Sequence, residues 1–239
     1  MTISVVIPVY NEENFLGDCL DSLMRQTRPA DEIIVVDNNS TDGTAALARR
    51  YKATVISETT QGIKPAAYKG FMASSGDIIA RCDADSILPE DWLSQIEKTF
   101  QERPGIVGLT GPANFYGANA FTASLAQVWY MYAYFILVGS ALANWPLFGS
   151  NCAVRRSAWL GIQHKVHRTR TDIHDDIDIS IHFTPQQRIA FMPALRVRIS
   201  ARSLQASGLL SRYNKGFTSL MIHWPADAPW RRWMNKIRQ

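Results

Sequence analysis

The triplet Asp83-Ala84-Asp85 is the clearest chemical signal in the sequence, because it comes just after the apolar run 78–80, where a buried strand should end. Side chains alternate along an extended segment, so Asp83 and Asp85 point to one side and Ala84 points to the other. Paired carboxylates suit Mg²⁺ or Mn²⁺, and nucleotide diphosphates usually bind together with these ions. A solvated loop after a strand would explain the same triplet, so its meaning depends on the elements around it.

Strands and helices are predicted to alternate through the N-terminal part of the chain. The expected strands are 3–9, 32–36, 54–57 and 77–81, and the expected helices lie in the intervals 12–26, 44–51 and 65–74. This alternation is typical of a parallel α/β sheet, whose ligands bind at the carboxyl ends of the strands. Asp37 and Asp83 both follow apolar strands at that position, where a hydrophobic core would not place a carboxylate.

Composition limits the class of protein. The 239 residues, 46% of them hydrophobic, can form one catalytic domain with a large core. A net charge of +4 fits an anionic substrate or a lipid surface, and no nucleic-acid motif is present. The three cysteines lack C-x-x-C spacing, which predicts neither a disulfide framework nor a cysteine-based zinc site. The chain begins directly with a predicted strand and shows no secretion signal, so we expect it in the cytoplasm.

Three segments together resemble the family-2 glycosyltransferases of the GT-A fold: residues 5–12 (VVIPVYNE), residues 35–44 (VVDNNSTDGT) and the acidic triplet 83–85. The resemblance covers about 3–183. It implies a Rossmann-like, mostly parallel sheet flanked by helices, and an inverting transfer of a sugar from a nucleotide-diphosphate donor to an acceptor hydroxyl. The metal, Mg²⁺ or Mn²⁺, would be held by Asp85 with Asp83 and would neutralise the leaving diphosphate. The donor-binding residues that the resemblance implies here are Pro8, Val9, Tyr10, Glu12, Asp37, Asn39, Asp83 and Ala84.

Two further segments carry weaker donor signals. Residues 62–70 resemble the stretch in which a basic residue faces the donor phosphates, and Lys64 is the candidate, although an ordinary surface lysine is an equal alternative. Residues 148–154 resemble the family's glycine-rich, acceptor-side loop, in which Asn151 would hydrogen-bond a sugar. A simple turn would use the same Gly-Ser-Asn residues.

The acidic segment 171–180 resembles the family's Glu-Asp motif. By position Asp176 is the predicted catalytic base, and Asp175 stands where the family more often has Glu. An inverting transfer needs one base to remove the acceptor proton while the oxygen attacks the anomeric carbon. By chemistry alone Asp172 and Asp178 are rival bases, and the whole run could form a solvated face.

The stretch 105–154 contains no charged residue. Its most apolar part, 125–142, is long enough to be weighed as a membrane span, but a span here would place the donor motifs and Asp176 on opposite sides of a bilayer. A helix that partly faces a membrane and a buried helix beside the acceptor both remain possible. Segment 230–238 interleaves aromatic and basic residues, as interfacial segments do. Arg196, Arg198 and Arg202 form either a basic edge near a phosphate or an ordinary exposed strand.

We therefore expect a catalytic domain over 1–205 and a helical, basic and aromatic tail over 206–239. The expected enzyme transfers single sugars to a lipid-linked or cell-envelope glycan, as a peripheral protein on the inner face of the cell membrane. Two alternatives stay open at this point: a non-catalytic nucleotide-sugar-binding protein of the same fold, and a nucleotidyltransferase.

Overall fold

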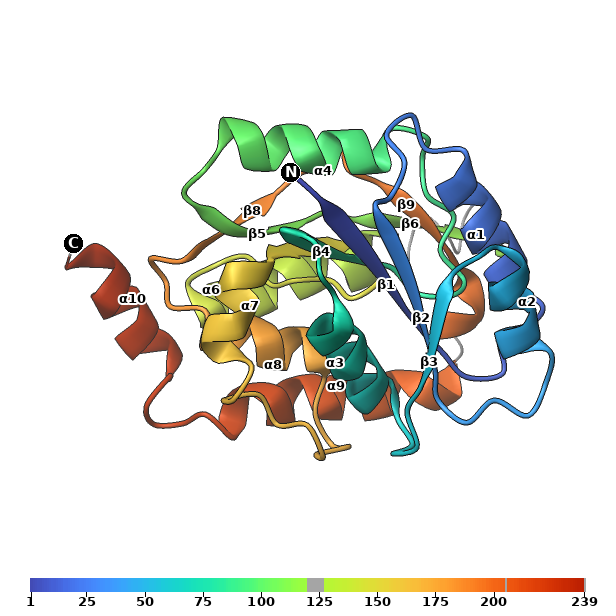
Figure 1. Ribbon diagram of the computed structural model, residues 1–239. Coiled ribbons are helices and arrows are strands. Elements are labelled where there is room, and N and C mark those ends of the chain that lie inside the picture. The colour runs from blue at the N-terminus through green and yellow to red at the C-terminus, as the bar shows by residue number, and fades with distance from the viewer. Residues whose placement is uncertain (120–126, 205, 239) are drawn as a thin grey trace.

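A seven-stranded sheet forms the centre of the protein, seen here in a computed structural model that describes residues 1–119, 127–204 and 206–238 (Figure 1). The strand order is β3-β2-β1-β4-β7-β5-β8. The strands are β1 (Ile3–Val9), β2 (Glu32–Asp37), β3 (Thr54–Ser57), β4 (Ile78–Arg81), β5 (Ile106–Thr110), β7 (Cys152–Arg155) and β8 (Arg188–Phe191). All neighbours are parallel except β7, which runs antiparallel to β4 and β5. A small second sheet pairs β6 (Ala113–Tyr116) with β9 (Val197–Ser200).

Helices cover both faces of this sheet, because alternate residues of its apolar strands point to opposite sides. Val5 and Ile7 pack in one core cluster with α1, α2 and α4, whereas Val6 packs in a second cluster with α3, α7 and α8. These helices are α1 (Leu16–Met24), α2 (Thr44–Arg50), α3 (Ile63–Ala73), α4 (Trp92–Glu102), α7 (Arg156–Ile162) and α8 (Asp175–His182). The predicted α/β class and the alternation of strands and helices are confirmed.

Helix α3 lies unusually close to the sheet. A Cβ atom on Gly70 would come within 2.3 Å of a Val6 methyl carbon and 2.9 Å of a Val36 methyl carbon, so only glycine fits there. This close approach fixes the height of α3 above the strands. It thereby sets the position of Lys64, in the first turn of the same helix.

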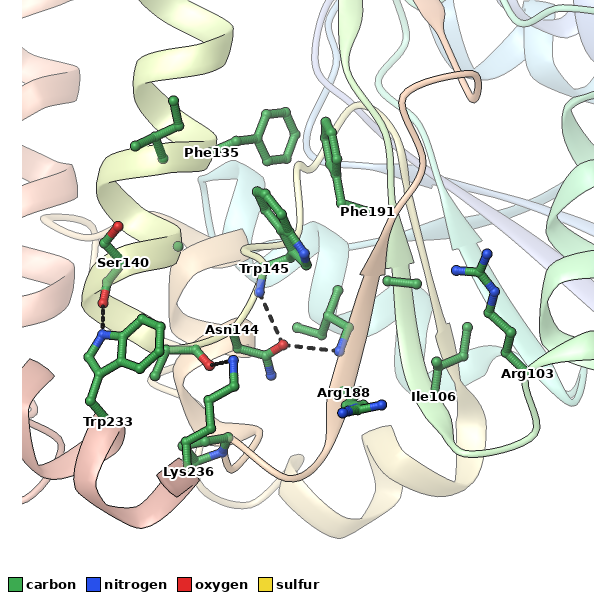
Figure 2. Close-up of a pocket in the computed structure, with 16 residues that line it drawn as sticks. Arg103, Ile106, Phe135, Ser140, Asn144, Trp145, Arg188, Phe191, Trp233 and Lys236 are labelled. Atoms are coloured by element: carbon green, nitrogen blue, oxygen red, sulfur yellow. Dashed lines mark hydrogen bonds between the residues drawn. The ribbon is translucent and has the colours of Figure 1, made fainter. Parts of the chain in front are cut away.

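The C-terminal part consists of η3 (Ala201–Leu204), α9 (Ala206–Met221) and α10 (Pro229–Ile237). Buried Arg232 anchors α10 by donating to the backbone oxygens of Leu142, Ile181 and Phe183 at 2.7–2.8 Å. Figure 2 shows two further bonds of this helix, from Trp233 and Lys236 to backbone oxygens near α6 (Gly139–Leu142). The predicted domain boundary falls at residue 205, outside the described residues.

The uncharged stretch is partly buried and partly exposed. Its described part forms β5, β6, the π-helices η1 (Gln127–Tyr132) and η2 (Tyr134–Val138), α6 and the beginning of β7. Residues 120–126 lie outside the described ranges. Phe135 is buried, whereas Ile136 and Leu137 are 59% and 68% exposed. None of the described helices is both long and apolar enough to cross a bilayer.

Candidate functional site

A cavity of about 490 Å³ brings together the end of β4, the start of α3 and the start of α8. Among its lining residues five cationic side chains face three carboxylates, so the cavity suits an anionic ligand. The cations are Lys64, Arg81, Arg170, Arg212 and Lys215, and the carboxylates are Asp83, Asp175 and Asp176. A slightly larger cavity between α6, α10 and β8 contains none of the predicted site residues (Figure 2).

Buried Arg81 organises the carboxylates of this cavity. Its guanidinium forms an ion pair with Asp175 and lies 3.4 Å from Asp83 Oδ1. The hydroxyl of Ser150 donates to the other oxygen of Asp83 at 2.5 Å. Gly149 makes room for Arg81, because a Cβ atom at this position would lie 2.9 Å from a guanidinium nitrogen. The site therefore holds Asp83 and Asp175 in place through one shared cation.

Asp176 lies where this polar cavity meets a second, apolar one. Its Oδ2 accepts a hydrogen bond from the Gly149 N–H at 3.2 Å, and its Oδ1 accepts one from the Ile177 N–H at 2.8 Å. Burial and the adjacent Asp175 charge raise the pKa of Asp176 above its usual value. The apolar cavity has a volume of about 300 Å³. Its lining includes Tyr134, Leu137, Phe148, Tyr213, Phe217 and Leu220.

Neither of the two rival bases lines the polar cavity. Asp172 is exposed and forms a bidentate ion pair with Arg170, whose Nε and Nη2 lie 2.9 and 2.6 Å from the two carboxylate oxygens. The Asp178 side chain is fully buried and points away from the cavity toward Tyr68 and His167. Of the four acids in this segment, Asp175 and Asp176 are the two that line the polar cavity, and Asp175 is already paired with Arg81.

Asp85 forms a second acidic group with Glu12. Arg202 joins them, with its Nε 2.9 Å from Asp85 Oδ2 and its Nη2 2.7 Å from Glu12 Oε1. Burial and the nearby Asp83 charge raise the pKa of Asp85 to about 6, although Arg202 opposes that shift. Within the described ranges Glu12 Oε2 is buried without a hydrogen-bond partner. Carboxylate oxygens with spare acceptor capacity fit Mg²⁺ or Mn²⁺, which would share this position with Arg202.

Lys64 is 4% exposed and lines the polar cavity. Its Nζ makes no hydrogen bond to any residue that the structure describes. Burial lowers the pKa of this ammonium group, although the charges of Asp178, Asp175 and Asp172 oppose the shift. Burying an ammonium group without a partner costs free energy, so an anion that binds this nitrogen would stabilise the protein. Lys69, in contrast, is exposed and pairs with Glu58.

The remaining predicted donor residues divide into two groups. Val9 and Asp37 are paired in register at the ends of β1 and β2, with Tyr10 half exposed beside them. Asp37 accepts a hydrogen bond from the Ser40 N–H, and Asn39 donates one to the Thr59 backbone oxygen. The other group consists of Pro8 and Ala84, whose side chains are buried, as is that of Val9, and thus belong to the interior rather than to the cavity.

The structure corrects the interpretation of Asn151. This side chain is fully buried, accepts a hydrogen bond from the Trp92 indole and donates to the backbone oxygens of Pro112 and Leu195. With its amide bonded in the core, it has no group to offer a sugar. The loop around it contributes Gly149 and Ser150 to the cavity instead.

Sequence reasoning missed Arg81 and Ser150. The signal for Arg81 was a charged residue at the end of the otherwise apolar strand 78–81, which requires a partner if it is buried. Arg202 was named only as part of a basic edge; Arg198 instead lies over the Tyr116 ring. The three cysteines are free and buried.

Comparison with known proteins decides the family. The sequence model described as "Glycosyl transferase family 2" matches residues 4–161, more than half of the chain. The chain belongs to glycosyltransferase family 2. Within this family, Glycosyltransferase AglE of Haloferax volcanii is 35% identical over 130 residues, which are 51% of this chain and 42% of AglE. The match thus covers less than half the length of that relative.

Solved structures share its GT-A fold. TarS of S. aureus in complex with UDP-GlcNAc superposes with a TM-score of 0.66 at 16% identity, over 84% of this chain and 58% of TarS. The mannosyltransferase PcManGT of Pyrobaculum calidifontis, in complex with GDP-Man and Mn²⁺, gives a TM-score of 0.62 at 21% identity, over 82% of this chain and 56% of PcManGT. At these identities the likeness shows the fold alone.

Proposed function

We propose that this glycosyltransferase moves single sugars from a nucleotide-diphosphate sugar to an acceptor hydroxyl, with inversion at the anomeric carbon. The observation that carries the proposal is the position of Asp176 between a basic, polar cavity and an apolar one. A donor in the first cavity and an acceptor in the second would meet at this carboxylate. The family membership supports the reaction class.

In the proposed donor complex the diphosphate lies beside Lys64, whose ammonium then gains the partner that it lacks. The base and ribose lie over the ends of β1 and β2, where Tyr10, Glu12, Asp37 and Asn39 are placed. Asp85, with Asp83 and Glu12 nearby, holds Mg²⁺ or Mn²⁺. When bound, the ion supplies positive charge that neutralises the leaving diphosphate.

Asp176 is the proposed base. It takes the acceptor's hydroxyl proton as that oxygen bonds to the anomeric carbon, while the bond to the diphosphate breaks on the opposite face and its electron pair leaves with the phosphate. The raised pKa of Asp176 makes it a stronger proton acceptor than an ordinary aspartate. Asp175 acts by holding Arg81, and Arg81 in turn positions Asp83.

The acceptor is proposed to carry an apolar chain, as a lipid-linked or cell-envelope glycan does. The cavity on the acceptor side of Asp176 is mostly apolar, and Leu137 and Phe217 continue it to the surface, 68% and 66% exposed. Trp230 and Ile237 of α10 are exposed as well, beside Arg231 and Lys236. Such surfaces bind the interface of anionic membranes, which supports peripheral attachment to the inner face of the cell membrane.

A thermal-shift screen tests the donor site. UDP-, GDP- and dTDP-sugars are added with and without Mn²⁺, because a ligand that binds only the folded state raises the melting temperature. We expect one nucleotide class to give a shift that Mn²⁺ enlarges, and Asp85→Ala to remove the enlargement. Folded protein with no shift for any donor would contradict the proposal. A donor shift without turnover on any lipid-linked acceptor would favour a binding role.

A further inference from the structure

Four side chains outside the donor cavity converge on one point. His167 comes from the loop before α8, Asp178 and His182 lie four residues apart on one face of α8, and His223 follows α9. One ligand atom from each lies within 4.8 Å of those of the other three. The loop before α8, α8 itself and the segment after α9 thus contribute to a single cluster.

The cluster is arranged around one carboxylate oxygen. Asp178 Oδ1 lies 2.8 Å from His167 Nδ1 and 3.6 Å from the Nε2 atoms of both His182 and His223. The other oxygen, Oδ2, accepts hydrogen bonds from the Tyr68 hydroxyl at 2.7 Å and from the backbone N–H of His167 at 2.8 Å. Asp178 is therefore fixed through Oδ2 and presents Oδ1 alone to the three imidazoles.

Two of these imidazole nitrogens lack a hydrogen-bond partner among the described residues. They are the Nε2 atoms of His182 and His223, and both are buried. Their side chains are only 13% and 8% exposed, so bulk water does not replace the missing partner. Leaving buried polar atoms without a partner destabilises the folded state. A group that binds both nitrogens would remove this destabilisation.

We propose that His167, Asp178, His182 and His223 form a tetrahedral transition-metal site, with Zn²⁺ as its natural ion. Three imidazole nitrogens and one carboxylate oxygen suit Zn²⁺, whereas Mg²⁺, Mn²⁺ and Ca²⁺ prefer all-oxygen sites. Ligand atoms around tetrahedral zinc lie about 3.3 Å apart. Here Asp178 Oδ1 lies 2.8 to 3.6 Å from the three imidazole nitrogens, and all four ligand atoms lie within 4.8 Å of one another. The Tyr68 hydroxyl orients the carboxylate, as outer partners of metal ligands do.

The site is structural, because all four positions are filled by protein side chains. It joins α8, which carries Asp175 and Asp176, to the end of α9, which contributes Arg212 and Lys215 to the polar cavity. It is distinct from the donor cation, which is proposed at Asp85. The metal would thereby fix the position of Asp176, the proposed catalytic base, relative to Arg212 and Lys215.

Metal content and Co²⁺ substitution test this inference. Elemental analysis of the purified chain should find about one Zn²⁺ per chain, and chelated protein refilled with Co²⁺ should show tetrahedral d–d absorption. His182→Gln and His223→Gln should lose both signals. Asp85→Ala should keep both, which separates this site from the donor cation and lets either proposal fail alone. His164→Gln, a change at an exposed histidine of the same loop, is the matched control.

Tyr68→Phe provides a milder variant in case the ligand changes prevent folding. It keeps all four ligands and should weaken Co²⁺ binding about 10- to 100-fold. Folded wild-type protein that contains no zinc and shows no Co²⁺ absorption would overturn the proposal, leaving a cluster held by hydrogen bonds alone. Retention of the Co²⁺ spectrum in folded His182→Gln and His223→Gln would overturn it as well.

Discussion

Arg81 on β4 and Asp175 at the start of α8, 94 residues apart, form a buried ion pair beneath the candidate donor cavity. Both side chains are more than nine-tenths buried, so neither charge can be left to solvent. This pair connects the strand that precedes the acidic triplet to the helix that carries the proposed base. The relative position of donor and acceptor sites therefore depends on it.

Removing one member of this pair should strongly destabilise the folded protein. Arg81→Met leaves the Asp175 carboxylate buried without compensation, so we expect a loss of about 3–5 kcal/mol in the free energy of unfolding. Urea denaturation near neutral pH measures this change. The double variant Arg81→Met/Asp175→Leu, which removes both charges, should recover much of the loss. A single variant as stable as the wild type would show that the pair does not hold these elements together.

Lys64→Met should have opposite effects on stability and on binding. Without donor, the variant should unfold at higher urea concentration, gaining about 1–3 kcal/mol, because a buried unpaired ammonium is removed. Donor affinity should fall, since the diphosphate loses its cation. Lys69→Met, on the exposed side of the same helix, is the control for both measurements. Unchanged donor affinity in Lys64→Met would contradict the proposed phosphate contact.

The same lysine gives a pH prediction. Burial holds the folded-state pKa of Lys64 below its ordinary value of 10.5, so unfolding takes up a proton in the interval between the two values. The wild type should gain stability as the pH rises through this interval, and Lys64→Met should lack that gain. The stability advantage of the variant should therefore shrink toward pH 10.5. A constant difference across the interval would argue against the shift.

Arg202→Met tests the proposed cation position. The Arg202 guanidinium binds carboxylate oxygens of Asp85 and Glu12, the two groups that would also bind the ion. Because Arg202 competes with the ion, its removal should tighten Mn²⁺ binding to donor-free protein. We expect about a two- to fivefold change in affinity, because the pair is partly exposed. Electron paramagnetic resonance titration of free Mn²⁺ measures it. Arg198→Met, on the neighbouring strand, should leave the affinity unchanged, and equal affinity in both variants would place the ion elsewhere.

Membrane attachment is tested best by point changes, because deleting 230–239 would also remove the buried anchor Arg232. Trp230→Ser/Ile237→Ser changes two side chains that are 53% and 76% exposed on α10. Binding to anionic liposomes should fall by about tenfold or more, since apolar surface no longer enters the interface. Met24→Ser, on α1 and about as exposed as Trp230, is the control. Undiminished binding would direct attention to Ile136 and Leu137.

Local sequence pattern was enough to predict the N-terminal strands, their helices and the acidic residues at the strand ends, because these features depend on residues close together in the chain. Asn151 shows the limit of such reasoning. Gly-Ser-Asn is a common loop sequence, yet Trp92 and Leu195, both far away in sequence, bind this amide in the core. The partner of Arg81 and the approach of His223 to Asp178 likewise become visible only when distant segments are folded together.

The central claim is that Asp176 is the base of a sugar transfer, and Asp176→Asn tests it most directly. Once a donor and acceptor pair is found, the variant should keep the donor-induced thermal shift and lose about 10²- to 10⁴-fold in transfer rate, because the amide cannot accept the proton. Asp172→Asn, in the same segment but exposed and not among the residues that line the cavity, should keep the wild-type rate. Normal turnover by Asp176→Asn would contradict the account.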